Sequence, residues 1–216
     1  MKIGITQKDD PAHKAVCTFA SRYYYNRHEI HITEFPDVFA YAYHKKIIGC
    51  FGLSYGTNTK LLPTEWYIPK KILQEKLTDP YNFSKKKLCE LGTRVVDKSK
   101  ITTKTNCGEI SLALATSLLH HACSRNFTYG IFTGDRTVRL LSRALHIPLH
   151  EFGVPDLSKR SAKYRKKWDA YFNGAQRYCY GINMPSTNDT YIKMQKTLST
   201  SGFYFLETKE FQLKVA

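Results

Sequence analysis

A predicted strand, helix and strand follow one another near the middle of this chain and limit the folds open to it. Residues 88–96 are rich in Leu, Val and Cys, which favour a buried, pleated surface. Residues 109–123 place Leu and Ile at helical spacing and predict a long helix. Residues 129–133 predict the next strand. A strand–helix–strand crossover of this kind is typical of α/β layering.

The first half of the chain predicts antiparallel strands instead. Residues 39–43 and 47–53 are strand-like and flank a polar turn at 44–46, which indicates a hairpin. Further helices are predicted at 11–25, 69–77, 136–145 and 189–198, and further strands at 29–33, 148–152, 177–182 and 203–206. Asp135 is suited to cap the helix that follows it. We therefore expect an α/β (α+β) fold with a mixed central sheet flanked by helices.

The chain is strongly basic. Its 33 Lys and Arg residues against 18 Asp and Glu residues give a formal net charge of +15. A field of this size favours an acidic partner, such as a nucleic acid, anionic lipid, a phosphorylated cofactor or an acidic protein. A solvated basic surface is the alternative. A hydrophobic content of 42% excludes a disordered chain and allows a sizeable core.

The cysteines and histidines do not indicate a metal site. None of the six cysteines forms a CxxC pair, and no Cys/His spacing is typical of zinc. We expect no metal and no permanently bound cofactor. No apolar run is long enough for a signal peptide or approaches the roughly 20 residues that span a bilayer. A cytoplasmic location is expected, and peripheral membrane contact stays open.

The strand at 88–96 carries a candidate catalytic pair. Strand alternation places Glu90 and Arg94 on one face, with Gly92 between them. A carboxylate and a guanidinium beside exposed backbone suit an amine and an amide-like ligand, with Glu90 taking a proton and Arg94 holding a carboxylate or Glu90 itself. The alternative is a structural ion pair on a strand.

Two further segments suit anionic partners. The loop at 102–108 enters a helix, where backbone N–H groups bind phosphate, and Lys104, Thr105, Asn106 and Gly108 are its candidate residues. An ordinary capped loop is the alternative. The basic run at 158–167 predicts a docking surface made of Lys159, Arg160, Lys163, Arg165, Lys166 and Lys167. A solvated loop is equally consistent with that run.

Several short segments, in this order and spacing, resemble a known family. They are residues 20–25, 35–37, 48–53, 61–67, 88–96, 132–134, 140–148 and 168–172. The pattern is similar to the thermostable-hemolysin family of bacterial proteins, which resembles the acyl-homoserine-lactone synthases and N-acyl amino acid synthases. The resemblance covers about residues 14–182. It implies one GNAT-like acyltransferase domain over residues 1–216, with a basic excursion at about 156–168 and a C-terminal extension after about 185.

The resemblance also implies a reaction. A fatty acyl group would pass from an acyl carrier protein or CoA thioester to an amino acid-like amine. Glu90 would assist the amine, and backbone N–H groups near Gly92 and Thr93 would stabilise the oxyanion. Arg22 and Glu65 match positions that hold the acceptor or shape its pocket. A small acidic carrier protein would suit the basic surface.

One departure from the related synthases affects the expected product. Residues 28–31 read His-Glu-Ile-His and lack the tryptophan that acyl-homoserine-lactone synthases carry there. An N-acyl amino acid or signal-like lipid is therefore expected rather than a homoserine lactone. Two other functions stay open: a membrane-active toxin or effector that adsorbs to anionic lipid, and nucleic-acid binding through the basic run.

Overall fold

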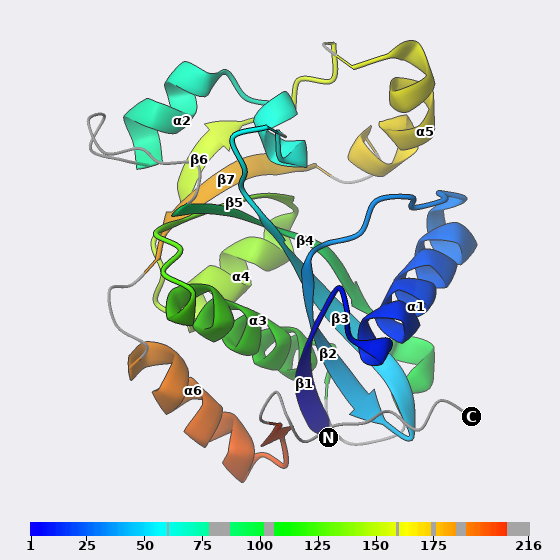
Figure 1. Ribbon diagram of the computed structural model, residues 1–216, viewed down its shortest axis with the longest axis vertical. Coiled ribbons are helices and arrows are strands. Elements are labelled where there is room, and N and C mark those ends of the chain that lie inside the picture. Colours follow the sequence, from blue (N-terminus) through cyan, green and yellow to red (C-terminus); the bar gives the residue numbers. More distant parts are fainter. Residues whose placement is uncertain are drawn as a thin grey trace. The chain divides into compact units, whose positions relative to one another are not determined.

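The computed structural model describes residues 1–59, 61–77, 87–101, 106–158, 160–173, 176–184 and 189–206 (Figure 1). These residues form two compact units. The first unit comprises the described parts of 1–53, 92–121 and 187–216, and the second those of 54–91 and 122–186. Each unit is therefore built from segments that are distant in the sequence.

The first unit is built on an antiparallel meander. β1 (Lys2–Gln7) pairs with β2 (Val38–His44), and β2 pairs with β3 (Lys46–Tyr55). The predicted hairpin is thus confirmed, and Lys45 makes its tight turn with a φ of 62°. The short β8 (Tyr204–Phe205) adds to the free side of β1 in parallel orientation.

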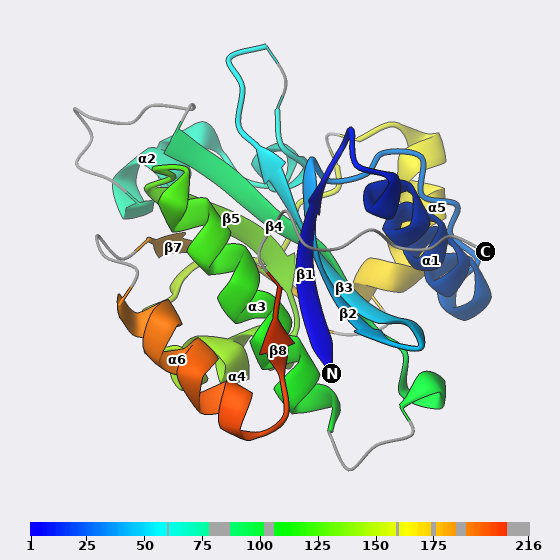
Figure 2. The same cartoon turned by 60° about the horizontal axis from the view of Figure 1, so that its bottom comes forward.

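Helices cover both faces of this meander (Figure 2). On one face α3 packs closely, because a Cβ added at Gly49 would lie 3.3 Å from the Leu114 side chain. On the other face Gly52 lies against Pro36, whose carbonyl is 2.9 Å from the His13 ring of α1. The helices of this unit are α1 (Pro11–His28), α3 (Cys107–Ser124) and α6 (Asp189–Thr200).

The second unit mixes parallel and antiparallel strands. β5 (Tyr129–Gly134) pairs in parallel with the start of β4 (Leu88–Val96) and antiparallel with β7 (Tyr178–Asn183). β6 (His150–Gly153) pairs antiparallel with β7. The helical segments are the 3₁₀ turn Pro63–Trp66, α2 (Lys70–Leu77), α4 (Arg136–Ala144) and α5 (Ala162–Asn173).

Two predictions about the chain's centre are confirmed. β4 and β5 are parallel and are separated in sequence by α3, as the crossover requires. In the described part of the chain, eight strands of both orientations form one sheet flanked by helices. Asp135 caps α4, since its carboxylate accepts a hydrogen bond from Thr137 N at 2.8 Å. β4 contributes residues 88–91 to the second unit and 92–96 to the first.

Other elements differ from the sequence predictions. The strand predicted at 29–33 is wrong, because α1 continues to His28 and Glu29 then closes it in the left-handed conformation, with a φ of 55°. β1 was not predicted, and the basic run leads into α5, which was not predicted as a helix. Within the described part of the chain, no helix has the length and apolar character needed to cross a membrane.

Candidate active site

The Glu90 carboxyl group lies buried in the second unit and is held by one residue. Its Oε2 accepts a hydrogen bond from Thr64 N at 3.0 Å, and its Oε1 accepts one from Thr64 Oγ1 at 2.8 Å. β4 supplies Glu90, and the 3₁₀ turn Pro63–Trp66 presents Thr64 to it. The Glu90 residue is only 8% exposed. Both carboxyl oxygens are therefore fixed in direction.

Burial changes the acidity of this group. The pKa of Glu90 is raised to about 8. Removal from water is the main cause and the Coulombic effect of Glu65 adds to it, while the two hydrogen bonds from Thr64 oppose the shift. A carboxyl group with a pKa near neutrality exchanges a proton readily at physiological pH. Glu90 thus has the property required of a general base or acid.

A chain of polar groups continues from Glu90 into the neighbouring strands. The Thr64 hydroxyl donates to Glu90, so its oxygen can accept from the Thr133 hydroxyl of β5 at 3.2 Å. Thr133 Oγ1 also lies 3.6 Å from Cys179 Sγ of β7. Burial raises the pKa of Cys179 to about 12, so its thiol stays protonated. Thr64, Thr133 and Cys179 were not among the predicted site residues, because only the fold brings them into this chain of contacts with Glu90.

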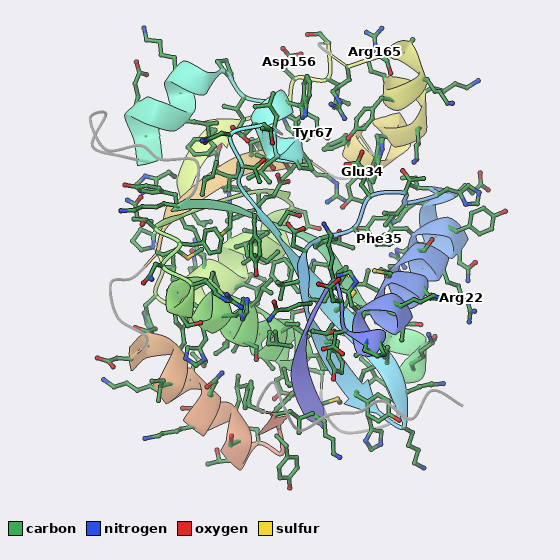
Figure 3. The ribbon with its side chains drawn as sticks, in the orientation of Figure 1. Arg22, Glu34, Phe35, Tyr67, Asp156 and Arg165 are labelled. Carbon is green, nitrogen blue, oxygen red and sulfur yellow. The ribbon has the colours of Figure 1, made fainter. Side chains whose placement is uncertain are left out.

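An aromatic cluster adjoins the same 3₁₀ turn. The hydroxyl groups of Tyr67 and Tyr164 are 2.5 Å apart, and the Tyr67 carbonyl accepts a hydrogen bond from Asp156 N at 3.3 Å (Figure 3). Burial is the main cause that raises the pKa of Tyr67. The Arg160 guanidinium carbon lies 3.9 Å from the ring centroid of Tyr164 and 4.8 Å from that of Trp66. Trp66 is 39% exposed, so the cluster reaches solvent.

Arg94, the predicted companion of Glu90, has a different partner. Its Nη1 donates to the Ser111 hydroxyl of α3 at 3.2 Å. Thr93, between the two, has a φ of 51°, which interrupts the two-residue alternation of a regular strand. The structure therefore gives Glu90 and Arg94 separate hydrogen-bond partners. A role for Arg94 in substrate binding stays a prediction.

Gly92 and Thr93 form an irregular step in β4. A Cβ added at Gly92 would meet nothing within 4 Å, so its side-chain position is open. A non-glycine residue with positive φ, as at Thr93, is uncommon and is seen at functional sites. Their role as oxyanion donors stays a prediction.

Two further predicted substrate-binding residues occupy different surroundings. Arg22 is exposed on α1 in the first unit (Figure 3). Glu65 belongs to the 3₁₀ turn of the second unit, where its Oε2 accepts a hydrogen bond from Leu62 N at 2.8 Å. Glu65 thus helps to form the turn that carries Thr64.

The predicted phosphate-binding loop is described only in part. Lys104 and Thr105 lie outside the described residues. Asn106 N donates to the Glu109 carboxylate at 3.0 Å, and Glu109 N donates to Asn106 Oδ1 at 2.9 Å, which is a reciprocal helix cap. Gly108 lies in this first turn, where an added Cβ would be 3.0 Å from Asn106 Oδ1. These contacts are those of a capped helix start.

The predicted docking residues divide into two groups. Lys163, Arg165 and Lys166 are exposed on α5. Arg160 and Lys167 are partly buried against aromatic rings, with Lys167 Nζ 5.8 Å from the Trp168 ring centroid. Lys159 lies outside the described residues. The exposed cations and the enclosed Arg160 therefore present different surfaces.

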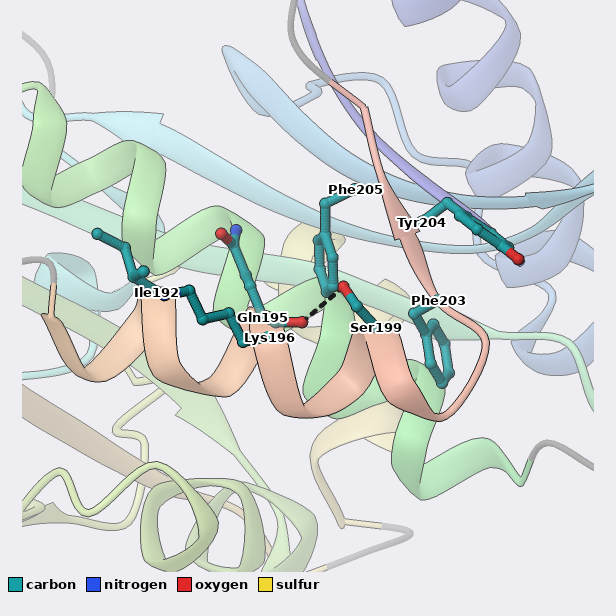
Figure 4. A pocket seen from close by; sticks show the side chains of 7 residues that line it. All are labelled: Ile192, Gln195, Lys196, Ser199, Phe203, Tyr204 and Phe205. Carbon is teal, nitrogen blue, oxygen red and sulfur yellow. Dashed lines mark hydrogen bonds between the residues drawn. The ribbon is translucent and has the colours of Figure 1, made fainter.

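A separate hollow of about 410 Å³ lies between α6 and β8 in the first unit (Figure 4). None of the predicted site residues lines it. Its lining residues are Ile192, Gln195, Lys196, Ser199, Phe203, Tyr204 and Phe205. Among the residues that the structure describes, no group of three His, Cys, Asp or Glu side chains could hold a metal ion.

Comparison with protein families identifies the relatives of this chain. A family model described as thermostable hemolysin matches residues 6–183. The chain belongs to the thermostable hemolysin family. This member of the family has no match among curated proteins.

Solved structures show the fold that this thermostable hemolysin family member shares. The acyl-homoserine lactone synthase LasI aligns with a TM-score of 0.59 and 9% identity, over 88% of this chain and 92% of LasI. BjaI, a CoA-dependent acyl-homoserine lactone synthase, aligns with a TM-score of 0.58 and 11% identity, over 98% and 94%. FeeM, an N-acyl amino acid synthase from uncultured soil microbes, aligns with a TM-score of 0.54 and 10% identity, over 83% and 88%. The predicted GNAT-like fold is confirmed.

Proposed function

We propose that this protein is an N-acyltransferase that moves a fatty acyl group from an acyl carrier protein or CoA thioester to an amino acid-like amine. The observation that carries the proposal is the buried Glu90, which has a pKa of about 8 and is fixed by Thr64. The fold adds support, because structures described as a CoA-dependent acyl-homoserine lactone synthase and as an N-acyl amino acid synthase share it.

In this reaction Glu90 acts on the amine. An amino group enters as ammonium and gives one proton to the Glu90 carboxylate, which frees the nitrogen lone pair. The nitrogen attacks the thioester carbonyl, a C–N bond forms, and the carbonyl oxygen becomes negative. Backbone N–H groups at Gly92 and Thr93 stabilise this oxyanion. The C–S bond then breaks, the nitrogen loses its second proton, and the thiolate leaves as a thiol.

The other predicted residues serve the two substrates. Arg22, Glu65 and Arg94 contribute to acceptor binding. Lys104, Thr105, Asn106 and Gly108 receive the phosphate groups of the pantetheine donor at the start of α3. The exposed cations of α5 guide an acidic carrier protein. The product is an N-acyl amino acid or a similar signal-like lipid.

Thiol release tests the proposal. Purified protein is incubated with long-chain acyl carrier protein or acyl-CoA and a panel of amino acids, and the free thiol is measured together with the mass of the lipid product. We expect acceptor-dependent thiol release that falls in Glu90→Gln. Release that is equal in wild type and Glu90→Gln, or that needs no amine, contradicts the proposed reaction.

The family description and the net charge of +15 favour membrane lysis as a second candidate function. Leakage of dye from vesicles that contain anionic lipid separates the two functions. Lysis predicts leakage by wild type and Glu90→Gln alike. The acyltransferase predicts intact vesicles at concentrations that give full thiol release.

A further inference from the structure

The Arg160 side chain packs against aromatic rings, but its guanidinium has no hydrogen-bond acceptor among the described residues. Its guanidinium lies between the rings of Trp66 and Tyr164, with its carbon 4.8 Å and 3.9 Å from their centroids. Its Nε is buried without a hydrogen-bond partner. Among the residues that the structure describes, none accepts a hydrogen bond from its guanidinium nitrogens. Arginine usually satisfies such donors with a carboxylate or phosphate.

The same short segment presents Arg160 and Glu90. Thr64 holds the Glu90 carboxyl group through two hydrogen bonds, and Trp66, two residues later, stacks on Arg160. Tyr67 follows, and its hydroxyl meets that of Tyr164 beneath the Arg160 guanidinium. Within the second unit, residues 64–67 therefore contact both the buried Glu90 carboxyl group and the partly buried Arg160 guanidinium.

The backbone fixes the approach of Arg160 to this segment. Asp156 N donates to the Tyr67 carbonyl at 3.3 Å, and Arg160 N donates to the Leu157 carbonyl at 3.0 Å. The loop that carries Arg160 is thus tied to Tyr67 and turned back on itself. The guanidinium needs little reorganisation to receive a ligand, which favours binding.

We propose that the Arg160 guanidinium binds the α-carboxylate of the acceptor amino acid while Glu90 faces its α-amino group. This inference rests on the proposed acyltransferase function and assigns its acceptor class. An α-amino acid carries a cation and an anion on neighbouring atoms, and the site offers one group of each opposite sign. A planar guanidinium between two rings matches one planar carboxylate in a bidentate contact.

The surroundings distinguish this subsite from one for the donor's phosphates. The groups in contact with the Arg160 guanidinium are aromatic rings, and Tyr67 and Tyr164 add hydroxyls rather than further positive charge. The phosphates of a CoA donor carry several negative charges, which a single guanidinium bordered by aromatic rings does not balance. The open Trp66 ring offers an apolar surface to the acceptor's side chain.

The experiment compares amino acids with their α-carboxamides, which keep the amine and lose the negative charge. Acyl transfer from acyl-CoA is measured with each of the twenty L-amino acids and its amide, for wild type, Arg160→Gln and Arg160→Lys. Arg125→Gln is the matched control, since Arg125 is an exposed cation outside the site. We expect the wild type and the control to prefer the acid form by roughly 10- to 100-fold in kcat/KM. We expect Arg160→Gln to lose this preference.

Arg160→Lys is a second variant that keeps the test valid if Arg160→Gln fails to fold. It keeps the charge but not the bidentate geometry, so we expect it to lose most of the preference while its circular dichroism stays that of wild type. An unchanged preference in the variants overturns the inference. A raised KM for acyl-CoA with an unchanged KM for the acceptor also overturns it, because Arg160 would then serve the donor.

Failure of the acyltransferase proposal can be distinguished from failure of the Arg160 inference. If no amine gives thiol release, that function is rejected, and calorimetric titration of the twenty amino acids into donor-free protein then decides the role of Arg160. Binding that Arg160→Gln abolishes and Arg125→Gln retains supports the carboxylate subsite. Binding that is equal in both variants, or no binding of any amino acid, overturns it.

Discussion

At the scale of single residues, the protonation of Glu90 decides when the proposed reaction can run. Glu90 accepts the amine's proton only as a carboxylate, and burial raises its pKa to about 8. We therefore expect kcat/KM to rise with pH and to level off above about 8. Glu90→Gln removes the base, so activity should fall by roughly 10²- to 10⁴-fold and lose this rise. Initial rates of thiol release between pH 6 and 9.5 measure both effects.

The same carboxyl group links folding stability to pH. Its pKa is about 8 in the folded protein against an ordinary value of 4.5, so the folded state holds this proton more tightly than the unfolded chain does. Tighter proton binding by Glu90 therefore stabilises the folded state fully below about pH 4.5, and this stabilisation is lost as the pH rises through about 8.

Glu90→Gln tests this linkage. The amide can accept from Thr64 N and donate to Thr64 Oγ1, so both native contacts can be replaced without a titrating group. We expect the Tm of wild type to fall more than that of Glu90→Gln between pH 5 and pH 9, measured by circular dichroism. Parallel Tm curves for the two proteins would show that Glu90 titrates near its ordinary pKa.

The sequence was sufficient to propose Glu90 as a candidate catalytic residue, but it did not indicate the residues that contact it. Glu90 stood out because a lone acid interrupts an apolar strand. Thr64 is 26 residues away, and its contact depends on a 3₁₀ turn that presents its backbone and side chain together. Arg160 was identified as one cation of a basic run, because composition does not show which cation is enclosed by rings.

At the scale of elements, β4 carries an open position at its irregular step. A Cβ at Gly92 would meet nothing within 4 Å, so we expect Gly92→Ala to change the free energy of unfolding by no more than about 0.5 kcal/mol. If the acyl carbonyl occupies this space, the methyl group displaces it and lowers kcat/KM on the order of 100-fold. Denaturant unfolding and thiol release measure the two quantities.

Gly52→Ala is the contrasting variant. Its added Cβ would collide with the Pro36 ring, so loss of stability is expected there as well as loss of activity. If a stable Gly92→Ala protein keeps full activity, the acyl carbonyl does not occupy the space beside Gly92 in β4.

The elements that were predicted correctly are those with strong local signals. The hairpin of β2 and β3 has two strand-like runs around a polar turn, and α3 has apolar residues at helical spacing. α5 was missed because six Lys and Arg residues dominate the segment at 158–167, although Tyr164 and Trp168 already had a helical spacing. The short strand at 29–33 was wrong because α1 and its left-handed end extend through its first residues.

At the scale of the whole molecule, the net charge of +15 predicts how the donor is selected. Electrostatic steering accelerates association with an acidic protein and weakens as salt screens it. We expect kcat/KM for an acyl carrier protein donor to fall steeply between 50 and 300 mM NaCl, and kcat/KM for the matching acyl-CoA to fall less. Steady-state kinetics with the two donors measures this difference.

Charge-reversal variants show which cations cause the salt dependence with the carrier protein. Combining Lys163→Glu, Arg165→Glu and Lys166→Glu removes the exposed cations of α5 and should abolish most of the salt dependence with the carrier protein. Reversal of Lys14, Lys193 and Lys196 in other helices changes the net charge equally and is the control. Equal losses in the two triple variants would assign the effect to overall charge alone.

The order of elements was enough to predict the class of the whole fold. A hairpin followed by a strand–helix–strand crossover leaves few possible arrangements for a mixed sheet. Solved structures with only 9–11% sequence identity to this chain share its fold. The acceptor and donor were not determined by this order, because they depend on side chains that meet only after folding.

The Cys179 thiol has a consequence for the order of events in catalysis. It is connected to Glu90 through Thr133 and Thr64, yet its pKa of about 12 keeps it protonated. A protonated thiol does not undergo transthioesterification. No acyl-enzyme should accumulate, and donor and acceptor should both be bound before any thiol departs. Intersecting rather than parallel double-reciprocal plots would follow, and Cys179→Ser should retain that pattern.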